Sequence, residues 1–216
     1  MDIKTNIKNA VNDVILVGTL LVSTHLTITF QQNGDYYNKL WIHKAVSLLV
    51  GFVVYELIIR DLNLYLLKQL KVSDSTMLLV LYDVIKLSTV YGIKELILYR
   101  FFKNDPTGVV KDWMYVKGIN IVGFIVYDVI FGVTPINIGG KYKIIVNDFV
   151  KLGLGDIFGG YAKKGTLDFD DLLNIGGTLI GLLVYHLVIK PIVSDDPTSG
   201  VSSYPDSLKK LSSLNN

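Results

Sequence analysis

The segment Gly51-Phe-Val-Val-Tyr55-Glu56-Leu-Ile-Ile59 occurs three times in this chain in recognisable form. It returns as Gly123-Phe-Ile-Val-Tyr127-Asp128-Val-Ile-Phe131 and as Gly181-Leu-Leu-Val-Tyr185-His186-Leu-Val-Ile189. Each copy keeps a glycine and, four residues later, a tyrosine, so the two residues share one face of a helix. The apolar runs around the copies do not alternate with a period of two, which favours helix over strand.

A second element precedes every copy of this segment. It reads Asp13-Val-Ile-Leu-Val17, Asp83-Val-Ile-Lys-Leu87 and Asp148-Phe-Val-Lys-Leu152. The intervals from its aspartate to the later tyrosine are 42, 44 and 37 residues. The same order in three places predicts an internal repeat of three tandem helix–loop–helix units, spanning about 8–62, 76–134 and 141–193.

The repeat predicts six helices joined by polar loops. They are Lys8–Phe30, Lys39–Ile59, Thr76–Phe102, Lys111–Thr134, Lys141–Tyr161 and Asp171–Val193. Pro135 and Pro191 mark the ends of two of them, as is typical of a residue that cannot continue a helix. The remaining segment, 194–216, is rich in Ser, Pro, Asp and Lys, a composition that predicts a flexible polar tail.

The composition indicates a membrane protein. Hydrophobic residues make up 50% of the 216 residues and charged residues 19%, whereas a soluble domain carries about 25% charged residues. The mean hydropathy is +0.44, and several apolar runs reach the roughly 17 residues that a bilayer span needs. We therefore expect an all-α integral membrane helical bundle over residues 1–193, with the lipid bilayer as its partner.

The number of membrane spans is open between four and six. Four helices are credible spans: the first helix of the first unit and the second helix of all three units. The other two helices, 76–102 and 141–161, carry several charged residues. Four spans place 14 of the 21 Lys and Arg residues inside, as the positive-inside rule prefers, and six spans show no bias. The pairs Asp83–Lys86 and Asp148–Lys151 are three residues apart, so we expect each pair to neutralise part of its own charge.

Three ionisable residues directly follow the repeated tyrosine: Glu56, Asp128 and His186. Because an ionisable side chain is costly in hydrocarbon, these residues are candidates for lining a proton or ion path. The alternative is a place near the lipid headgroups. Glu56 lies fifteen residues after Trp41, about 22 Å along a helix, which is close to the thickness of the hydrocarbon layer.

The repeated glycine–tyrosine pairs are candidates for helix packing. Glycine permits close approach of two helices, and a tyrosine hydroxyl can form a hydrogen bond across the contact. The residues concerned are Gly51, Tyr55, Gly123, Tyr127, Gly181 and Tyr185. The pattern favours packing within the chain, and assembly into a homo-oligomer is the alternative.

The sequence contains no recognised catalytic or cofactor-binding constellation. The lack of cysteine excludes disulfides, thiolate metal sites and cysteine nucleophiles. The three histidines lack metal-site spacing, and no P-loop, nucleophile elbow or Ser/His/Asp set occurs. A net charge of +2 with dispersed basic residues argues against nucleic-acid binding. We therefore expect no enzymatic activity, no cofactor and no metal site.

The tryptophan-led helices Trp41–Tyr55 and Trp113–Tyr127, with the early segment Asp13–Thr19, resemble small multi-pass membrane proteins of large nucleocytoplasmic DNA viruses. The resemblance covers about residues 8–193. It implies a virion membrane protein beneath or beside the capsid, in the virion membrane or a host internal membrane. Capsid or other membrane proteins would be its partners, and no catalytic residue carries over.

Two functions follow as expectations. The first is a structural membrane protein that anchors or organises the membrane beneath a capsid, which agrees with the packing pairs and the resemblance. The second is a small transporter or channel for protons or ions, with a path lined by Glu56, Asp128 and His186. Internal repeats are common in transporters.

Overall fold

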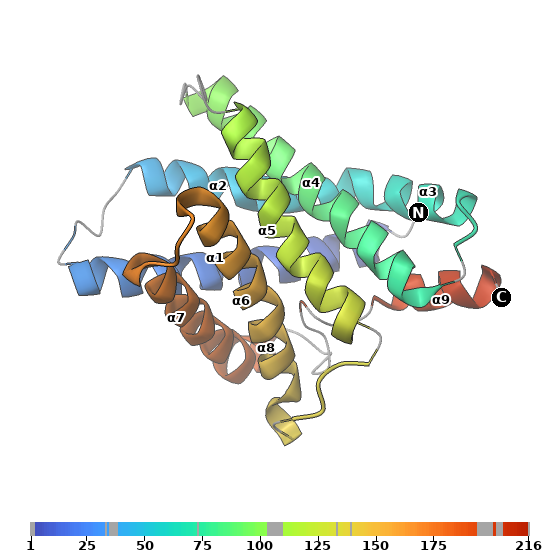
Figure 1. The fold of residues 1–216 in the computed structure, drawn as a ribbon. Coiled ribbons are helices and arrows are strands. Elements are labelled where there is room, and N and C mark those ends of the chain that lie inside the picture. Colours follow the sequence, from blue (N-terminus) through green and yellow to red (C-terminus); the bar gives the residue numbers. More distant parts are fainter. Residues whose placement is uncertain are drawn as a thin grey trace.

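Long helices form the body of the protein, shown as a computed structural model in Figure 1. The structure describes residues 3–32, 34, 39–72, 74–102, 110–132, 134–138, 140–193, 201 and 205–215. Helices account for 91% of the described part, and it contains no strand. This confirms the prediction of an all-helical chain.

The helices follow the order that the sequence predicts. The single helices are α1 (Ile3–Gln32), α4 (Ser75–Phe102), α5 (Val110–Phe131) and α6 (Lys143–Lys164), the last preceded by a short 3-10 turn, η2 (Gly140–Tyr142). Two longer helices each contain a π-helical turn. The first consists of α2 (Lys39–Val54), η1 (Tyr55–Ile59) and α3 (Arg60–Gln69). The second consists of α7 (Phe169–Val184), η3 (Tyr185–Ile189) and α8 (Lys190–Val193).

The second helix continues ten residues beyond its predicted end at Ile59. The π-helical turn η1 keeps the backbone helical, and the amide of Arg60 bonds to the carbonyl of Tyr55. In α3, Asn63 and Leu67 are fully buried, so this more polar stretch packs on the bundle rather than forming a loop. The two π-helical turns begin at repeat-equivalent tyrosines, and such turns often occur at functional sites.

The C-terminal segment also differs from the prediction of a flexible polar tail. Residues Asp206–Asn215 form a helix, α9, which contacts α3 and α4, as Figure 1 shows. Leu208 and Leu211 lie three residues apart on one face, and both are buried in the adjacent hydrophobic core. A short apolar stripe is therefore enough to order this mostly polar stretch. Residues 194–200, 202–204 and 216 of the predicted tail lie outside the described residues.

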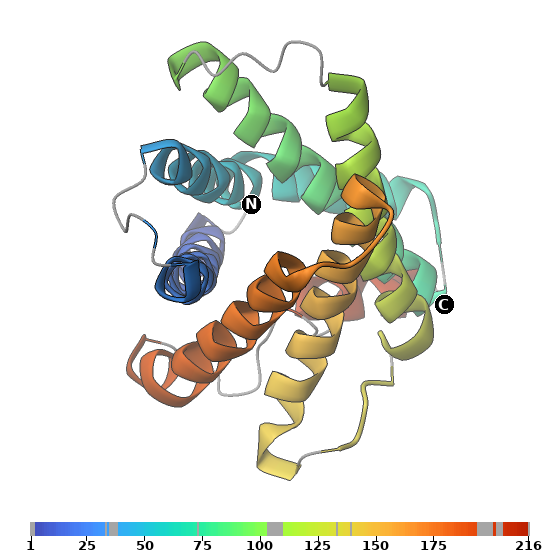
Figure 2. The ribbon, with the colours of Figure 1, turned by 60° about the vertical axis from the view of Figure 1, so that its left-hand side comes forward.

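The long helices form a closed ring. α1 packs against α2, α2 against α4, α4 against α5, α5 against α6, α6 against α7, and α7 against α1. Figure 2 shows this order by colour, from blue through green to orange. The most extensive contacts join α2 with α4, α5 with α6, and α7 with α1. The second helix of each predicted hairpin thus packs mainly on the first helix of the next, and the third hairpin packs on the first.

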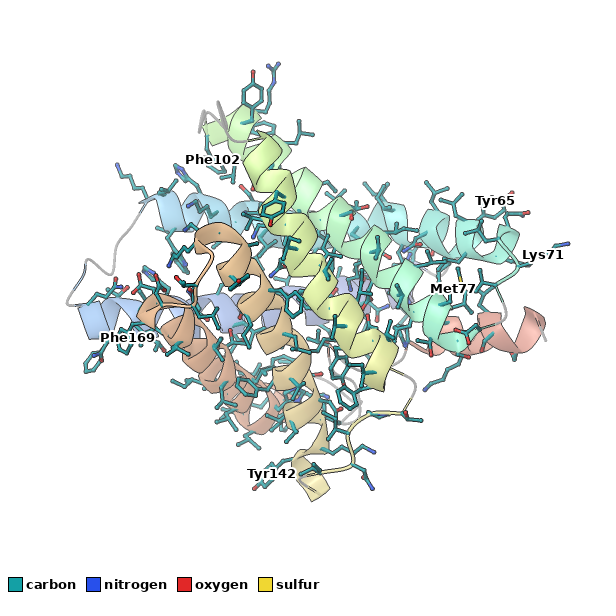
Figure 3. The ribbon with its side chains drawn as sticks, in the orientation of Figure 1. Tyr65, Lys71, Met77, Phe102, Tyr142 and Phe169 are labelled. Carbon is teal, nitrogen blue, oxygen red and sulfur yellow. The ribbon has the colours of Figure 1, made fainter. Side chains whose placement is uncertain are left out.

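The outer surface is rich in apolar side chains, and the interior holds charged side chains beside its apolar core. Phe30, Phe101 and Ile192 are 75% to 80% exposed, while Asp128 and Lys151 are at most 2% exposed. The aromatic residues Tyr142 and Phe169, labelled in Figure 3, lie at the edges of the bundle and are exposed. Soluble proteins rarely expose so many large apolar side chains, so lipid rather than water suits the outer surface.

Four stretches of the described chain are long and apolar enough to cross a membrane. They are Ile3–Gln32, Lys39–Gln69, Ser75–Phe102 and Phe169–Val193. At most 28% of the apolar window of each is buried inside the protein, so most of this apolar surface faces outward. These helices indicate a membrane protein.

The set of four differs in part from the predicted one. Ser75–Phe102 qualifies by its length and hydropathy, although the sequence left it doubtful. Its charged residues Asp83 and Lys86 are held in ion pairs with other helices. The predicted span at Lys111–Thr134 is not in the set, and its crossing of the membrane stays a prediction.

The α6–α7 connection shows how the third hairpin turns. Gly165 has a φ of 74° and ends α6, and Asp168 caps the start of α7 by accepting from the amide of Asp171 at 3.1 Å. The Asp171 carboxylate in turn accepts from the amide of Asp168, which completes a capping box. The ammonium of Lys164 bonds to Asp168 and, with the capping hydrogen bond, lowers the pKa of Asp168 to about 2.

Candidate functional site

The three ionisable residues that follow the repeated tyrosines all lie inside the bundle. Glu56 is 2% exposed, Asp128 is fully buried, and the His186 side chain is 5% exposed. Burial at this level requires partners, because an isolated charge is very costly in a low-dielectric interior. Each of the three residues has a partner, described below as clusters one, two and three.

Cluster one consists of Asp13 on α1, Glu56 on η1 and Lys86 on α4. The Lys86 ammonium lies 2.7 Å from Asp13 Oδ2 and 2.9 Å from Glu56 Oε1. It also lies 5.5 Å from the ring centroid of Tyr55. The other carboxylate oxygen of Glu56 is 3.5 Å from the guanidinium Nε of Arg60. A lysine of the second hairpin therefore joins both helices of the first.

Cluster two repeats this arrangement one hairpin further along the chain. It consists of Asp83 on α4, Asp128 on α5 and Lys151 on α6. The Lys151 ammonium lies 2.5 Å from Asp83 Oδ2 and 2.7 Å from Asp128 Oδ1, and 5.7 Å from the ring centroid of Tyr127. A lysine of the third hairpin therefore joins both helices of the second.

Cluster three has a different composition at the corresponding place. His186 Nε2 lies 2.9 Å from Asp148 Oδ2, and the imidazole packs edge-on against the ring of Tyr185 with centroids 5.1 Å apart. Lys86 and Lys151 each stand three residues after the aspartate of their helix, and in the first hairpin this position is Leu16. Leu16 is buried and packs in a core cluster with Tyr185. Here histidine replaces the carboxylate, and leucine replaces the lysine.

The sequence pointed to the wrong partners for the two lysines. We expected Lys86 and Lys151 to be neutralised by the aspartate three residues earlier on the same helix. Each lysine instead binds the aspartate of the preceding hairpin, Asp13 or Asp83. The first-helix aspartates are therefore site residues that sequence reasoning missed. Their regular place in the repeat, always at the start of the first-helix element, was the available signal.

The repeated glycines lie at close helix–helix contacts. A methyl group added at Gly51 would come within 2.7 Å of the Val90 carbonyl oxygen, and one at Gly123 within 2.5 Å of the Leu154 carbonyl oxygen. At Gly181 it would meet the Cα of Leu20 at 2.9 Å. All three contacts join a second helix to the first helix of the next hairpin in the ring, which agrees with packing inside the chain.

The repeated tyrosines are buried beside these contacts. Tyr55 and Tyr127 are fully buried and Tyr185 is 3% exposed. The Tyr55 hydroxyl accepts from Asn63 Nδ2 at 2.7 Å, and the Tyr127 hydroxyl donates to Asn147 Oδ1 at 2.6 Å. The hydroxyls thus hold the polar side chains of the interior in place. Assembly into a homo-oligomer stays a prediction.

A cavity of about 2450 Å³, open to the outside over part of its surface, lies between the helices of the ring and reaches the C-terminal segment. Residues of clusters one and two line it, namely Asp13, Glu56, Asp83, Lys86 and Lys151. Asp128, Asp148 and His186 are not in the lining. Of the three residues predicted to line a path, Glu56 is among the cavity-lining residues, whereas Asp128 is paired with Lys151 and His186 with Asp148.

The described residues contain no group of three or more His, Asp or Glu side chains placed to hold a metal ion. Comparison of the chain with protein-family models, curated proteins and solved structures finds no match. The resemblance to viral membrane proteins therefore stays a prediction.

Proposed function

We propose that this protein is a membrane transporter or channel in which three related hairpins enclose a polar path for a small hydrophilic solute or ion. The observation that carries the proposal is the cavity of about 2450 Å³, whose lining includes charged residues among apolar ones, in a bundle whose outer surface is apolar. Charged groups at membrane depth are costly and commonly mark a path for a solute or an ion.

The recurring contacts support the three-hairpin organisation. Lys86 and Lys151 make the same two bonds at successive places in the ring, and both lie near the repeated tyrosine. The glycine contacts of Gly51, Gly123 and Gly181 recur in the same cyclic order. Six helices arranged in this way around a cavity would each cross the membrane, which is the six-span form of the prediction.

The ion pairs lie where movement of the hairpins would act on them. Each lysine belongs to one hairpin and both of its carboxylate partners belong to the preceding one. Separating the two hairpins therefore breaks two charge-assisted hydrogen bonds at once. In a path that opens and closes, these clusters would hold the closed form.

A structural role in a membrane is the second candidate. It is favoured by the pairing of every carboxylate and lysine in clusters one and two, since such pairing serves to assemble hairpins even without transport. The location in a virion membrane and partners in a capsid belong to this second candidate and rest on the resemblance alone.

Flux measurements on the purified chain in liposomes distinguish the two. We expect the wild-type protein to move at least one of protons, alkali cations or small anions across the vesicle membrane. Glu56→Gln alters the cavity lining and should reduce this flux strongly, as should Asp128→Asn through its loss of charge beside Lys151.

Asp170→Asn removes an exposed carboxylate outside the cavity lining and serves as the matched control. It should leave flux unchanged. Correctly folded wild-type protein that moves none of these solutes would contradict the proposal and leave the structural role.

A further inference from the structure

A second group of charged residues lines the cavity nearer the hairpin loops. Lys44 on α2, Lys94 on α4 and Lys117 on α5 form this lysine group. Lys94 follows Lys86 by eight residues on α4, so it lies about 12 Å further along the helix than cluster one. Lys117 is in electrostatic range of both Lys44 and Lys94. The lysine group is therefore one local patch of positive charge, apart from the three clusters.

Carboxylates do not balance this patch. Glu95 and Asp156 are the cavity-lining carboxylates within electrostatic range of Lys117. Glu95 is paired with Lys94 at 3.1 Å, and Asp156 accepts a hydrogen bond from the Thr178 hydroxyl at 3.3 Å. Three lysines face two carboxylates, so the patch keeps an excess of positive charge.

Two of the lysines have no carboxylate of their own. Within the described part of the chain, no carboxylate oxygen lies within 4.0 Å of the ammonium of Lys44 or Lys117. In clusters one and two, by contrast, each lysine binds two carboxylates. The ammonium groups of Lys44 and Lys117 therefore keep hydrogen-bond donors for a ligand in the cavity.

Lys117 is also held in position. Its ammonium lies 4.9 Å from the ring centroid of Tyr91, and the Tyr91 hydroxyl donates to Asn120 Oδ1 at 2.7 Å. Asn120 Nδ2 donates to the Gly155 carbonyl oxygen at 2.7 Å. This chain of contacts links α4, α5 and α6 and fixes the aromatic ring beneath the ammonium. Lys117 is therefore positioned by its neighbours, whereas Lys44 is exposed on α2.

We propose that the lysine group binds a small anion that carries a carboxylate or a phosphate, which names the class of solute for the transport function proposed above. Lys117 is partly buried, and burying an ammonium without a carboxylate is costly, so a bound anion offsets that cost. Lysine acts as a compact point charge toward both carboxylate and phosphate. The cavity is larger than the roughly 300–1,000 Å³ of ordinary small-molecule sites, so it can accept such a solute.

Binding is tested on the full chain in detergent, by thermal unfolding with inorganic phosphate and, separately, with succinate. Ionic strength is held constant, and potassium ion is the cation probe. We expect phosphate, succinate or both to raise the unfolding temperature, because a ligand that binds the folded state stabilises it. Lys117→Gln should weaken binding about tenfold or more, and Lys117→Arg should retain most of it.

Lys68→Gln is the matched control, since Lys68 is exposed on α3 and lies outside the cavity lining. It should leave anion binding unchanged. Lys44→Gln provides a second variant if Lys117→Gln does not fold. An unfolding temperature that neither anion raises, or anion binding that both glutamine variants retain, overturns the anion site.

The two proposals fail in different ways. Anion binding that depends on Lys117, together with no flux in liposomes, supports the anion site and contradicts transport. Flux of cations without binding or flux of either anion supports transport and contradicts the anion site. Anion flux that is lost in Lys117→Gln and kept in Lys68→Gln supports both.

Discussion

Clusters one and two differ from cluster three at two positions that go together. In the first two, a carboxylate follows the repeated tyrosine and a lysine reaches it from the next hairpin. In cluster three, His186 occupies the position of that carboxylate and Leu16 the position of that lysine. The first-helix aspartate, Asp148, is present as in the other two clusters. A buried carboxylate without its cation costs several kcal/mol, so loss of the lysine alone is strongly destabilising. The comparison indicates that the lysine and the second-helix carboxylate form one unit.

Loss of the lysine from cluster two should give the largest effect. Lys151→Leu leaves Asp83 and Asp128 without their shared cation, and Asp128 is fully buried. We expect a loss of about 3–5 kcal/mol in the free energy of unfolding, measured by denaturant titration in mild detergent. Lys86→Leu should cost less, because Arg60 still lies beside Glu56 in cluster one. Equal stability of Lys151→Leu and wild type would mean that the ion pairs do not hold the hairpins together.

Copying cluster three into cluster two should recover part of that loss. The double variant Lys151→Leu with Asp128→His has the histidine and leucine of cluster three beside the remaining Asp83. We expect it to be more stable than Lys151→Leu alone, with a coupling energy of about 0.5–3 kcal/mol between the two sites. The four proteins of a double-mutant cycle, unfolded under one set of conditions, measure this term. Strictly additive effects would show that the two positions are independent.

The sequence was informative where the signal is local. The repeated glycine–tyrosine spacing predicted six helices, and the structure contains helices over each predicted range with ends shifted by a few residues, apart from the extension through α3. The glycines at 51, 123 and 181 lie at helix contacts, as their pattern indicated.

The partners of the lysines could not be found in this way, because they depend on ring closure. A spacing of three residues on one helix favoured the pairs Asp83–Lys86 and Asp148–Lys151, but which helix faces which is a property of the folded bundle. The π-helical turns at Tyr55 and Tyr185 have no signal in hydropathy either. For α9, Leu208 and Leu211 gave too short a stripe to outweigh the surrounding polar residues.

Close glycine contacts should be sensitive to a single methyl group. In Gly51→Ala the new methyl would lie 2.7 Å from the Val90 carbonyl oxygen, so α2 and α4 must move apart. We expect a loss of about 1–3 kcal/mol in the free energy of unfolding, and Gly181→Ala should behave similarly beside cluster three. Gly92→Ala is the matched control on α4, where an added methyl meets nothing within 4 Å. It should be neutral or stabilising by up to about 1 kcal/mol.

The smallest effect should come from the cap of the helix that carries His186. Asp168→Ala removes the side chain that caps α7 and binds Lys164, and it alters no residue of clusters one or two. Because Lys164 lowers the folded-state pKa of Asp168 to about 2, below the unfolded value of about 3.9, this carboxylate stabilises the fold fully above pH 4. Its contribution should decline as pH falls from 4 toward 2. Unfolding curves of wild type and Asp168→Ala should therefore differ at pH 6 and converge near pH 2. A difference that persists at pH 2 would assign the effect of Asp168 to packing rather than to its charge.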